Sequence, residues 1–263
     1  MLKSIQSFND RTDLVWGVSR QSSGTAGSFL KSFEVIDGKK FYYKASNYDS
    51  VRGFIGHESL NEIVACNLAE MLGISHLLYE LVTAKINVRD KVEEATFTKS
   101  QDFKRAGEHK MTFETFYALH KLNGEELLNF VQRMGLSEYV YDMFLLDWII
   151  CNRDRHGANI EVLVNNKGFR MAPLFDHGLS FAFSCYDFRD IETFDYMKDG
   201  PVNNFIGSCV LSDNIKTVPK TVRDKVDDID YSRLFDGVYG APQKYYDAIE
   251  RMVKMRVDYV KKI

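Results

Sequence analysis

The segment CNRDRHGANIEVL, at residues 151–163, constrains the fold of this chain more than any other part of the sequence. It directly follows an apolar stretch with helical spacing that ends at Ile150, and it contains a glycine that suits a tight loop. The residues after this loop favour a hairpin that returns the chain to Asp176. We therefore expect Asp154, Asn159 and Asp176 to converge on one site.

The residue types at this expected site match the needs of phosphoryl transfer. Asn159 and Asp176 offer side-chain oxygens, and Mg2+ takes one or two such ligands together with phosphate oxygens. Asp154 then remains available to orient or deprotonate an acceptor hydroxyl group. An aspartate and an asparagine in one loop are a weak signal alone, because both residues are common in turns. A turn-and-cap interpretation of the same residues is therefore the alternative.

Two neighbouring motifs resemble the catalytic core of HipA-like serine/threonine kinases. They are the run N-R-D-R-H-G-A-N and the following P-L-F-D-H-G, and the close match covers about 26 residues. The resemblance implies that Asp154 is the catalytic aspartate and that Asn159 and Asp176 are the metal ligands. It also places His156 next to the phosphates and Phe175 among the nucleotide-binding residues. Asp-His-Gly stands where eukaryotic kinases commonly have Asp-Phe-Gly.

A kinase also needs a cation near the α- and β-phosphates of ATP, and Lys44 is the candidate. It lies on a predicted strand after a tight turn, where the resemblance places a lysine. Glu62, in a predicted helix, resembles the glutamate that holds this lysine in the family. Glu58 lies one turn earlier and is the competing partner. An ordinary surface lysine on a strand is the simpler interpretation of Lys44.

The Ser- and Gly-rich segment SRQSSGTAGSF, at residues 19–29, is a candidate phosphate-covering loop, since small residues let backbone N–H groups approach phosphates closely. It is not a Walker A sequence, and a merely flexible loop would look the same. The expected phosphate-contacting residues are Ser23, Gly24, Thr25 and Gly27. The resemblance implies that this loop can be autophosphorylated, and the acceptor candidates are Ser22, Ser23, Thr25 and Ser28.

The segment ATFTKSQDF, at residues 95–103, resembles the strand that leads into the adenine-binding hinge of the family. We therefore expect the backbone from Thr98 to Ser100 to contact adenine.

The pattern of predicted elements indicates an α+β, two-lobed fold of protein-kinase type. Strands are predicted at 28–36, 40–45, 77–88 and 94–99, with an Asp-Gly turn at 37–38 and a helix over 58–72 that Gly73 ends. From about residue 111 the apolar spacing becomes helical. We expect a small β-rich N-lobe with one helix at 1–105 and a larger helical C-lobe at 106–263.

Composition limits the partners and the location of the protein. Apolar residues make up 45% and charged residues 27% of the chain, and the net charge is -3, so direct nucleic-acid binding is not expected. The four cysteines show no paired spacing, and no apolar run approaches the ~20 residues that span a bilayer. We expect a cytoplasmic protein without a membrane span. Signal-independent secretion into host cells is the alternative.

The leading hypothesis is an ATP- and Mg2+-dependent kinase that phosphorylates a serine or threonine of a protein and autophosphorylates. The first alternative is a phosphoinositide or small-alcohol kinase, which shares the DRHxxN core. The others are a non-catalytic nucleotide-binding module and a metal hydrolase that uses Asp154, His156, Asp176 and His177 as ligands. Family members act as toxins or effectors, but the short segment before the first expected strand makes an antitoxin partner unexpected here. The pattern predicts no particular oligomeric state.

Overall fold

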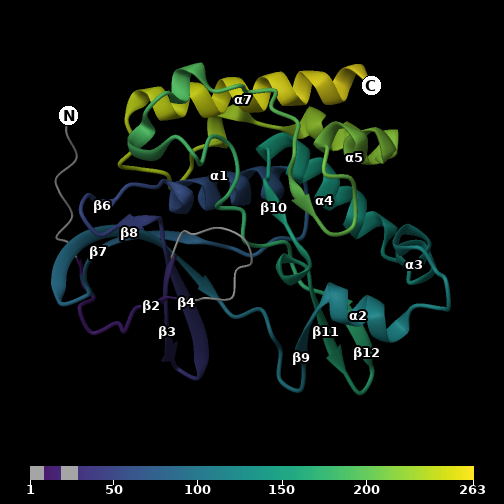
Figure 1. Ribbon diagram of the computed structural model, residues 1–263, viewed down its shortest axis with the longest axis horizontal. Helices are drawn as coiled ribbons and strands as arrows, with labels where there is room; N and C mark the ends of the chain where they lie inside the picture. The colour runs from purple at the N-terminus through teal and green to yellow at the C-terminus, as the bar shows by residue number, and fades with distance from the viewer. Residues whose placement is uncertain (1–8, 19–28) are drawn as a thin grey trace.

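The computed structural model describes residues 9–18 and 29–263 of the chain (Figure 1). A twisted sheet with one helix forms the N-terminal lobe, and helices with two small sheets form the second lobe. This α+β architecture, β-rich first and helical later, is the one expected from the sequence.

The main sheet has six strands in the order β1-β7-β8-β4-β3-β2. All neighbouring pairs are antiparallel except β1 with β7. The strands are β1 (Asn9–Asp10), β2 (Gly17–Val18), β3 (Leu30–Ile36), β4 (Lys39–Ala45), β7 (Glu80–Val88) and β8 (Lys91–Gln101). A separate short hairpin consists of β5 (Tyr48–Asp49) and β6 (Gly53–Phe54). The four predicted strands are confirmed, with ends that differ by a few residues.

The turn between β3 and β4 fixes the register of these two strands. Asp37 and Gly38 have φ values of 50° and 75°, the left-handed conformation that a two-residue hairpin turn of this kind requires. Asp tolerates this region better than most residues, and Gly adopts it without steric cost. The resulting register pairs Lys31 directly with Lys44. Paired residues share one face of a sheet, so both lysines point to the same side.

Helix α1 (Glu58–Met71) links the sheet to the second lobe. It ends as predicted, since Gly73 has a φ of 63° directly after the C-cap residue Leu72. The buried Asn61 side chain donates hydrogen bonds to the carbonyls of Gly178 (3.1 Å) and Ser180 (3.0 Å) and accepts one from the Tyr245 hydroxyl (3.0 Å). These contacts fix α1 against a loop and a helix of the second lobe.

The second lobe consists of short strands and α-helices, the last of which is the long helix α7. They are β9 (His109–Thr112), α2 (Phe113–His120), α3 (Leu127–Arg133), α4 (Ser137–Ile150), β10 (Asp154–Arg155), β11 (Glu161–Asn165), β12 (Gly168–Met171), then β13 (Asn203–Asn204), α5 (Leu211–Thr217), α6 (Lys220–Arg223) and α7 (Gln243–Lys262). Strands β12, β11 and β9 form one sheet in that order, and β10 pairs in parallel with β13.

The core of the second lobe is built around α4. All residues from Met143 to Ile150 are buried, as expected of a helix that is covered on every side. Helix α7 packs across it (Figure 1). The fully buried Arg256 of α7 donates to the carbonyls of Trp148 (2.7 Å) and Tyr196 (2.9 Å), while the Trp148 indole donates to the Arg256 carbonyl (3.0 Å). No helix in the described part of the chain is long and apolar enough to cross a membrane.

His57 precedes α1 at a junction between the two lobes. Its ring stacks on Phe188 at a centroid distance of 5.1 Å and meets the edge of Tyr245 at 5.5 Å. Burial lowers the pKa of His57 to about 4. The imidazole is therefore neutral in the folded protein at neutral pH.

We predict that His57 makes the fold less stable as the pH falls. The unfolded chain binds a proton here below about pH 6.5, whereas the folded chain does so only below about pH 4. The free energy of unfolding should therefore fall by up to about 1.4 kcal/mol per pH unit across this window. Urea unfolding of the parent and His57→Phe at several pH values measures this effect. Parallel pH curves for the two proteins would contradict it.

Candidate functional site

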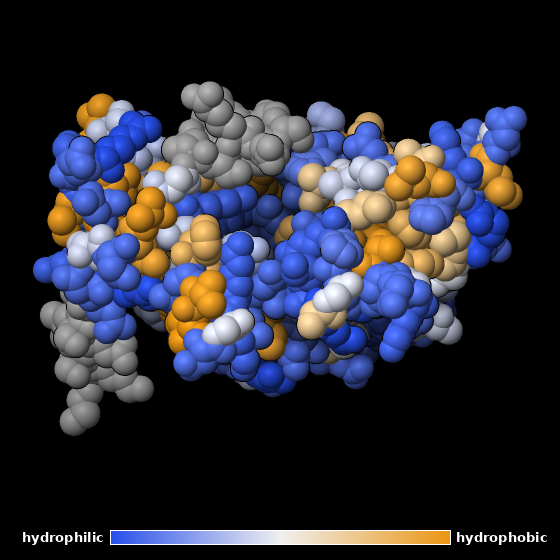
Figure 2. Space-filling model, turned by 90° about the horizontal axis from the view of Figure 1, so that it is seen from below, coloured by the Kyte–Doolittle hydropathy of each residue, from blue (hydrophilic) through white to orange (hydrophobic). Residues whose placement is uncertain are grey.

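A cleft lies between the main sheet and the second lobe, and Figure 2 shows the surface hollowed there with a largely hydrophilic rim. The cavity measures about 530 Å3, within the range of small-molecule sites. The sheet lines it with Lys31, Lys44, Thr98 and Ser100, and the second lobe with Phe175 and Asp176. An adjoining recess shares Lys31, Lys44 and Asp176 and adds Asp154, His156 and Asn159. The structure thus brings together these predicted site residues: Lys44, Thr98, Ser100, Asp154, His156, Asn159, Phe175 and Asp176.

Lys44 is bound by two carboxylates from different parts of the chain. Its Nζ donates to Glu62 Oε1 of α1 at 3.2 Å and also to Asp176 Oδ1. Glu58, the competing candidate, instead accepts a hydrogen bond from the Asn47 backbone N–H at 3.0 Å. The geometry therefore pairs Lys44 with Glu62.

The charges in this cluster are mutually stabilised. Burial opposes the charge on Lys44, but Asp176 and Glu62 outweigh it and raise the pKa of this lysine. Burial likewise opposes the Asp176 charge, and Lys44 and Lys31 outweigh it and hold the pKa of that carboxyl well below its usual range. Both groups are therefore ionised at neutral pH.

Arg155 holds the loop that carries Asp154 and Asn159 against the core. Its guanidinium binds both Asp147 oxygens of α4, at 3.0 and 2.7 Å, and both side chains are 1% exposed. It also donates to the Phe175 carbonyl at 3.0 Å and lies 3.0 Å from Nδ1 of His177. This one side chain therefore joins α4, the loop that carries Asp154 and the segment that carries Asp176. Arg155 thus has a structural role.

Asp154 and Asn159 are linked through the backbone of their loop. The Asn159 side-chain amide donates to the Asp154 carbonyl at 2.9 Å, and the Asp154 N–H donates to the Asn152 side chain at 3.2 Å. His156 Nδ1 accepts a hydrogen bond from Ala158 N–H at 3.1 Å, while its Nε2 lies 3.6 Å from Asp154 Oδ2. These bonds stabilise the short 3-10 turn η1 (Gly157–Asn159). The side chains of Asp154 and Asn159 both line the recess.

Asp176 lies in an unusual backbone conformation, with a φ of 61°. Its N–H donates to the Tyr79 hydroxyl at 3.2 Å, and the next N–H, of His177, donates to Glu62 Oε2 at 2.8 Å. Gly178 follows, where a Cβ atom would lie 3.1 Å from that of Glu58. Close packing against α1 therefore explains the glycine of the Asp-His-Gly motif.

Lys31 and Tyr79 are among the cleft residues that were not predicted from the sequence. Lys31 has a recognisable signal, since the Asp-Gly turn implies the register that places it beside Lys44. Tyr79 has none, because it lies just before β7 and reaches Asp176 from 97 positions away in the chain.

The end of β8 forms one edge of the cleft. The side chains of Thr98 and Ser100 line the cleft, but their backbones pair with Lys44 and Tyr42 of β4, and Lys99 pairs with Glu80 of β7. Strand β7 begins at Glu80, so Gln101 has no partner on the β7 side of β8 among the described strands. The free backbone groups at this edge of the cleft therefore belong to Gln101.

The connection after β8 is tied to the second lobe. Arg170 donates to the Phe103 carbonyl at 2.9 Å and pairs with Glu108 at 2.8 Å, while Lys110 pairs with Asp102 at 3.0 Å. The predicted lobe boundary at 105/106 falls within this connection. The predicted phosphate-loop residues, which are Ser23, Gly24, Thr25 and Gly27, lie outside the described residues.

The donor set in the recess fits a hard divalent cation. Asp176 offers a carboxylate and Asn159 a carboxamide oxygen, the ligand types that Mg2+ accepts beside phosphate oxygens. The metal-hydrolase alternative fits poorly, because the buried His177 ring contacts Arg155 in the interior. Over residues 9–18 and 29–263, no group of three or more His, Cys, Asp and Glu side chains is placed to hold a metal.

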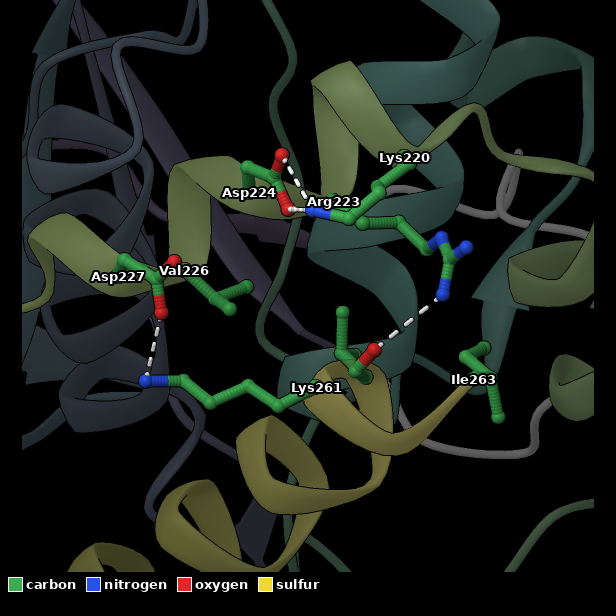
Figure 3. Close-up of a pocket in the computed structure, with 8 residues that line it drawn as sticks. Lys220, Arg223, Asp224, Val226, Asp227, Lys261 and Ile263 are labelled. Carbon is green, nitrogen blue, oxygen red and sulfur yellow. Dashed lines mark hydrogen bonds and ion pairs between the residues drawn. The ribbon is translucent and has the colours of Figure 1, made fainter.

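Another hollow, of about 290 Å3, lies between α6 and the end of α7 (Figure 3). Its charged side chains pair with one another, Lys220 with Asp224 at 2.7 Å and Lys261 with Asp227 at 2.8 Å. The first is a local pair four residues apart, and the second joins α7 to the short 3-10 helix η4 (Asp224–Asp228) that follows α6. The convergent cation and carboxylates of the interlobe cleft make that cleft the candidate site.

The fold and this cleft define a two-lobed, kinase-like protein. The chain is similar to the crystal structure of the Helicobacter pylori proinflammatory kinase CtkA, with a TM-score of 0.62 and 17% identity over 88% of this chain and 92% of that one. It is also similar to a structure of the Shewanella oneidensis MR-1 toxin–antitoxin system HipA, HipB and operator DNA, with a TM-score of 0.54 and 11% identity over 91% of this chain and 64% of that one. The HipA-like kinase fold expected from the sequence is confirmed. No protein-family model and no curated protein matches the sequence.

We predict that Asp147→Ala strongly destabilises the fold. The change leaves the Arg155 guanidinium buried without its carboxylate, which typically costs about 3–5 kcal/mol. Glu138→Ala, at an exposed position of the same helix, is the matched control and should change stability by less than about 0.5 kcal/mol. Denaturant unfolding compares the two, and equal effects would show that the buried pair has no special importance.

Proposed function

We propose that this protein is an ATP- and Mg2+-dependent serine/threonine protein kinase of HipA-like type. The observation that supports this most is the position of Lys44, which is held by Glu62 and Asp176 in a cleft that also contains Asp154 and Asn159. Phosphoryl transfer needs a cation for the phosphates, oxygen ligands for a metal and a carboxylate for the acceptor, and these groups supply all three.

Each side chain has a separate task in this proposal. Lys44, with Lys31 beside it, binds and orients the phosphate chain of ATP. Asn159 and Asp176 would hold Mg2+, which when bound neutralises charge on the phosphate oxygens. Asp154 orients the acceptor hydroxyl and takes its proton as the oxygen attacks the γ-phosphorus, and ADP leaves with the electron pair of the broken bond. The backbone of Gln101 contacts adenine.

The acceptor is proposed to be a protein. The tight N-R-D-R-H-G-A-N and P-L-F-D motifs support this choice, and so does the likeness to CtkA, whose name describes a proinflammatory kinase. A role as an effector or toxin is also part of the proposal, and the likeness to CtkA and to the HipA toxin–antitoxin structure supports it. Autophosphorylation of the 19–28 segment remains part of the proposal.

We predict that Asp154→Ala and Asp176→Ala fail in different ways. Asp154→Ala should lower phosphoryl transfer about 10²–10⁴-fold, the usual contribution of a general base, yet still bind Mg-ATP. Asp176→Ala should lose the Mg2+-dependent rise in melting temperature that ATP causes, because it removes a metal ligand. Incubation with γ-labelled ATP and a thermal melt with and without Mg2+ measure the two effects.

Asp258→Ala, on the exposed face of α7, is the matched control and should behave as the parent. Label on serine or threonine of protein supports the proposed specificity, while label that moves into lipid or a small alcohol overturns it. Binding of Mg-ATP without any turnover in the parent would instead indicate a non-catalytic nucleotide-binding module.

A further inference from the structure

The segment 201–205 is hydrogen-bonded to the loop that carries Asp154, about 50 positions earlier in the chain. The N–H groups of Asn203 and Phe205 donate to the carbonyls of Arg153 and Arg155, each at 3.0 Å, and form the parallel β10–β13 pair. The Arg153 guanidinium donates to the Pro201 carbonyl at 2.7 Å. The segment 201–205 therefore has a fixed position directly beside Asp154.

These backbone hydrogen bonds place the Asn203 side chain against the Asp154 carboxylate. Asn203 Nδ2 donates to Asp154 Oδ1 at 2.9 Å. Among residues 9–18 and 29–263, Asn203 is the side chain that donates a hydrogen bond to the Asp154 carboxylate. His156 Nε2 lies 3.6 Å from Asp154 Oδ2, which is beyond normal hydrogen-bond length. The terminal torsion of an aspartate is broad, so an external donor is needed to fix the direction of its oxygens.

We propose that Asn203 is a positioning residue for Asp154, which it holds in the orientation that accepts the proton of the acceptor hydroxyl. With Oδ1 engaged by the amide, Oδ2 stays directed toward the recess that also contains Asn159 and Asp176. Asn203 itself is exposed, so it approaches Asp154 from the open side of the cleft, where an acceptor must enter. The inference rests on the proposed phosphoryl transfer.

The neighbouring Asn204 has a different task and provides a control. Its Oδ1 accepts hydrogen bonds from the N–H groups of Ile206 (3.1 Å) and Gly207 (3.0 Å), and so stabilises the turn after β13. Asn204→Ala loosens the segment without removing the donor to Asp154. Asn203→Ala removes the donor and leaves the turn intact.

Steady-state ATP turnover of the full chain tests the inference through kcat and KM. Asn203→Ala should lower kcat about tenfold to a hundredfold, as loss of a supporting hydrogen bond to an active-site ligand typically does, with KM for ATP and the melting temperature unchanged. Asn203→Asp should be worse than Asn203→Ala, because it replaces the donor with a like charge that repels Asp154. Asn204→Ala should keep the parental kcat.

The order of the variants separates a positioning role from a structural one. A structural role predicts that Asp, of nearly the same size, is tolerated better than Ala at this exposed site. Parental kcat in Asn203→Asp, or an equal loss in Asn204→Ala, would overturn the inference while leaving the proposed function intact. Absence of turnover in the parent, by contrast, would overturn the proposed function and this inference with it.

Discussion

The buried ion pair between Asp147 and Arg155 is the contact on which the site depends. Asp147 belongs to the second half of α4, in which every residue is buried, and Arg155 lies one residue after Asp154. The same guanidinium contacts the carbonyl before Asp176 and the ring after it. Because two charges this deeply buried tolerate little displacement, the core of the second lobe dictates where both aspartates stand.

Two neighbouring lysines in the cleft favour the binding of an anion. Lys31 and Lys44 lie side by side on paired strands, and burial lowers the pKa of Lys31. Two neighbouring cations in a partly buried cavity repel each other, and a polyphosphate relieves that repulsion. Asp176 balances part of this charge but is also the residue that a metal would engage. Lys44 and Asp176 bind each other across the cleft. A bound nucleotide would engage Lys44 and its metal would engage Asp176, so the two side chains would separate.

The sequence allowed the fold to be predicted where the signal was local. The Asp-Gly turn, the glycine after α1 and the apolar run of α4 each determine their own conformation, and the two motifs placed Asp154, Asn159 and Asp176 in one recess. The contacts of Tyr79 and Asn203 could not be predicted, because they arise from segments 97 and 49 positions away from their partners. The strand edge at Gln101 could not be predicted either, because the length of β7, rather than residue type, decides which backbone groups of β8 lack a strand partner among the described residues.

The anchoring of the connection after β8 has a mechanical consequence. Phe103 and Glu108 are bonded to Arg170, and Asp102 to Lys110, so this connection belongs to the second lobe as a rigid body. The end of β8 is thereby one of the places where the second lobe holds the first, another being α1 through Asn61. A rotation of the sheet away from the second lobe would have to break one of these two sets of hydrogen bonds. Together they limit how far Lys44 can move from Asp176.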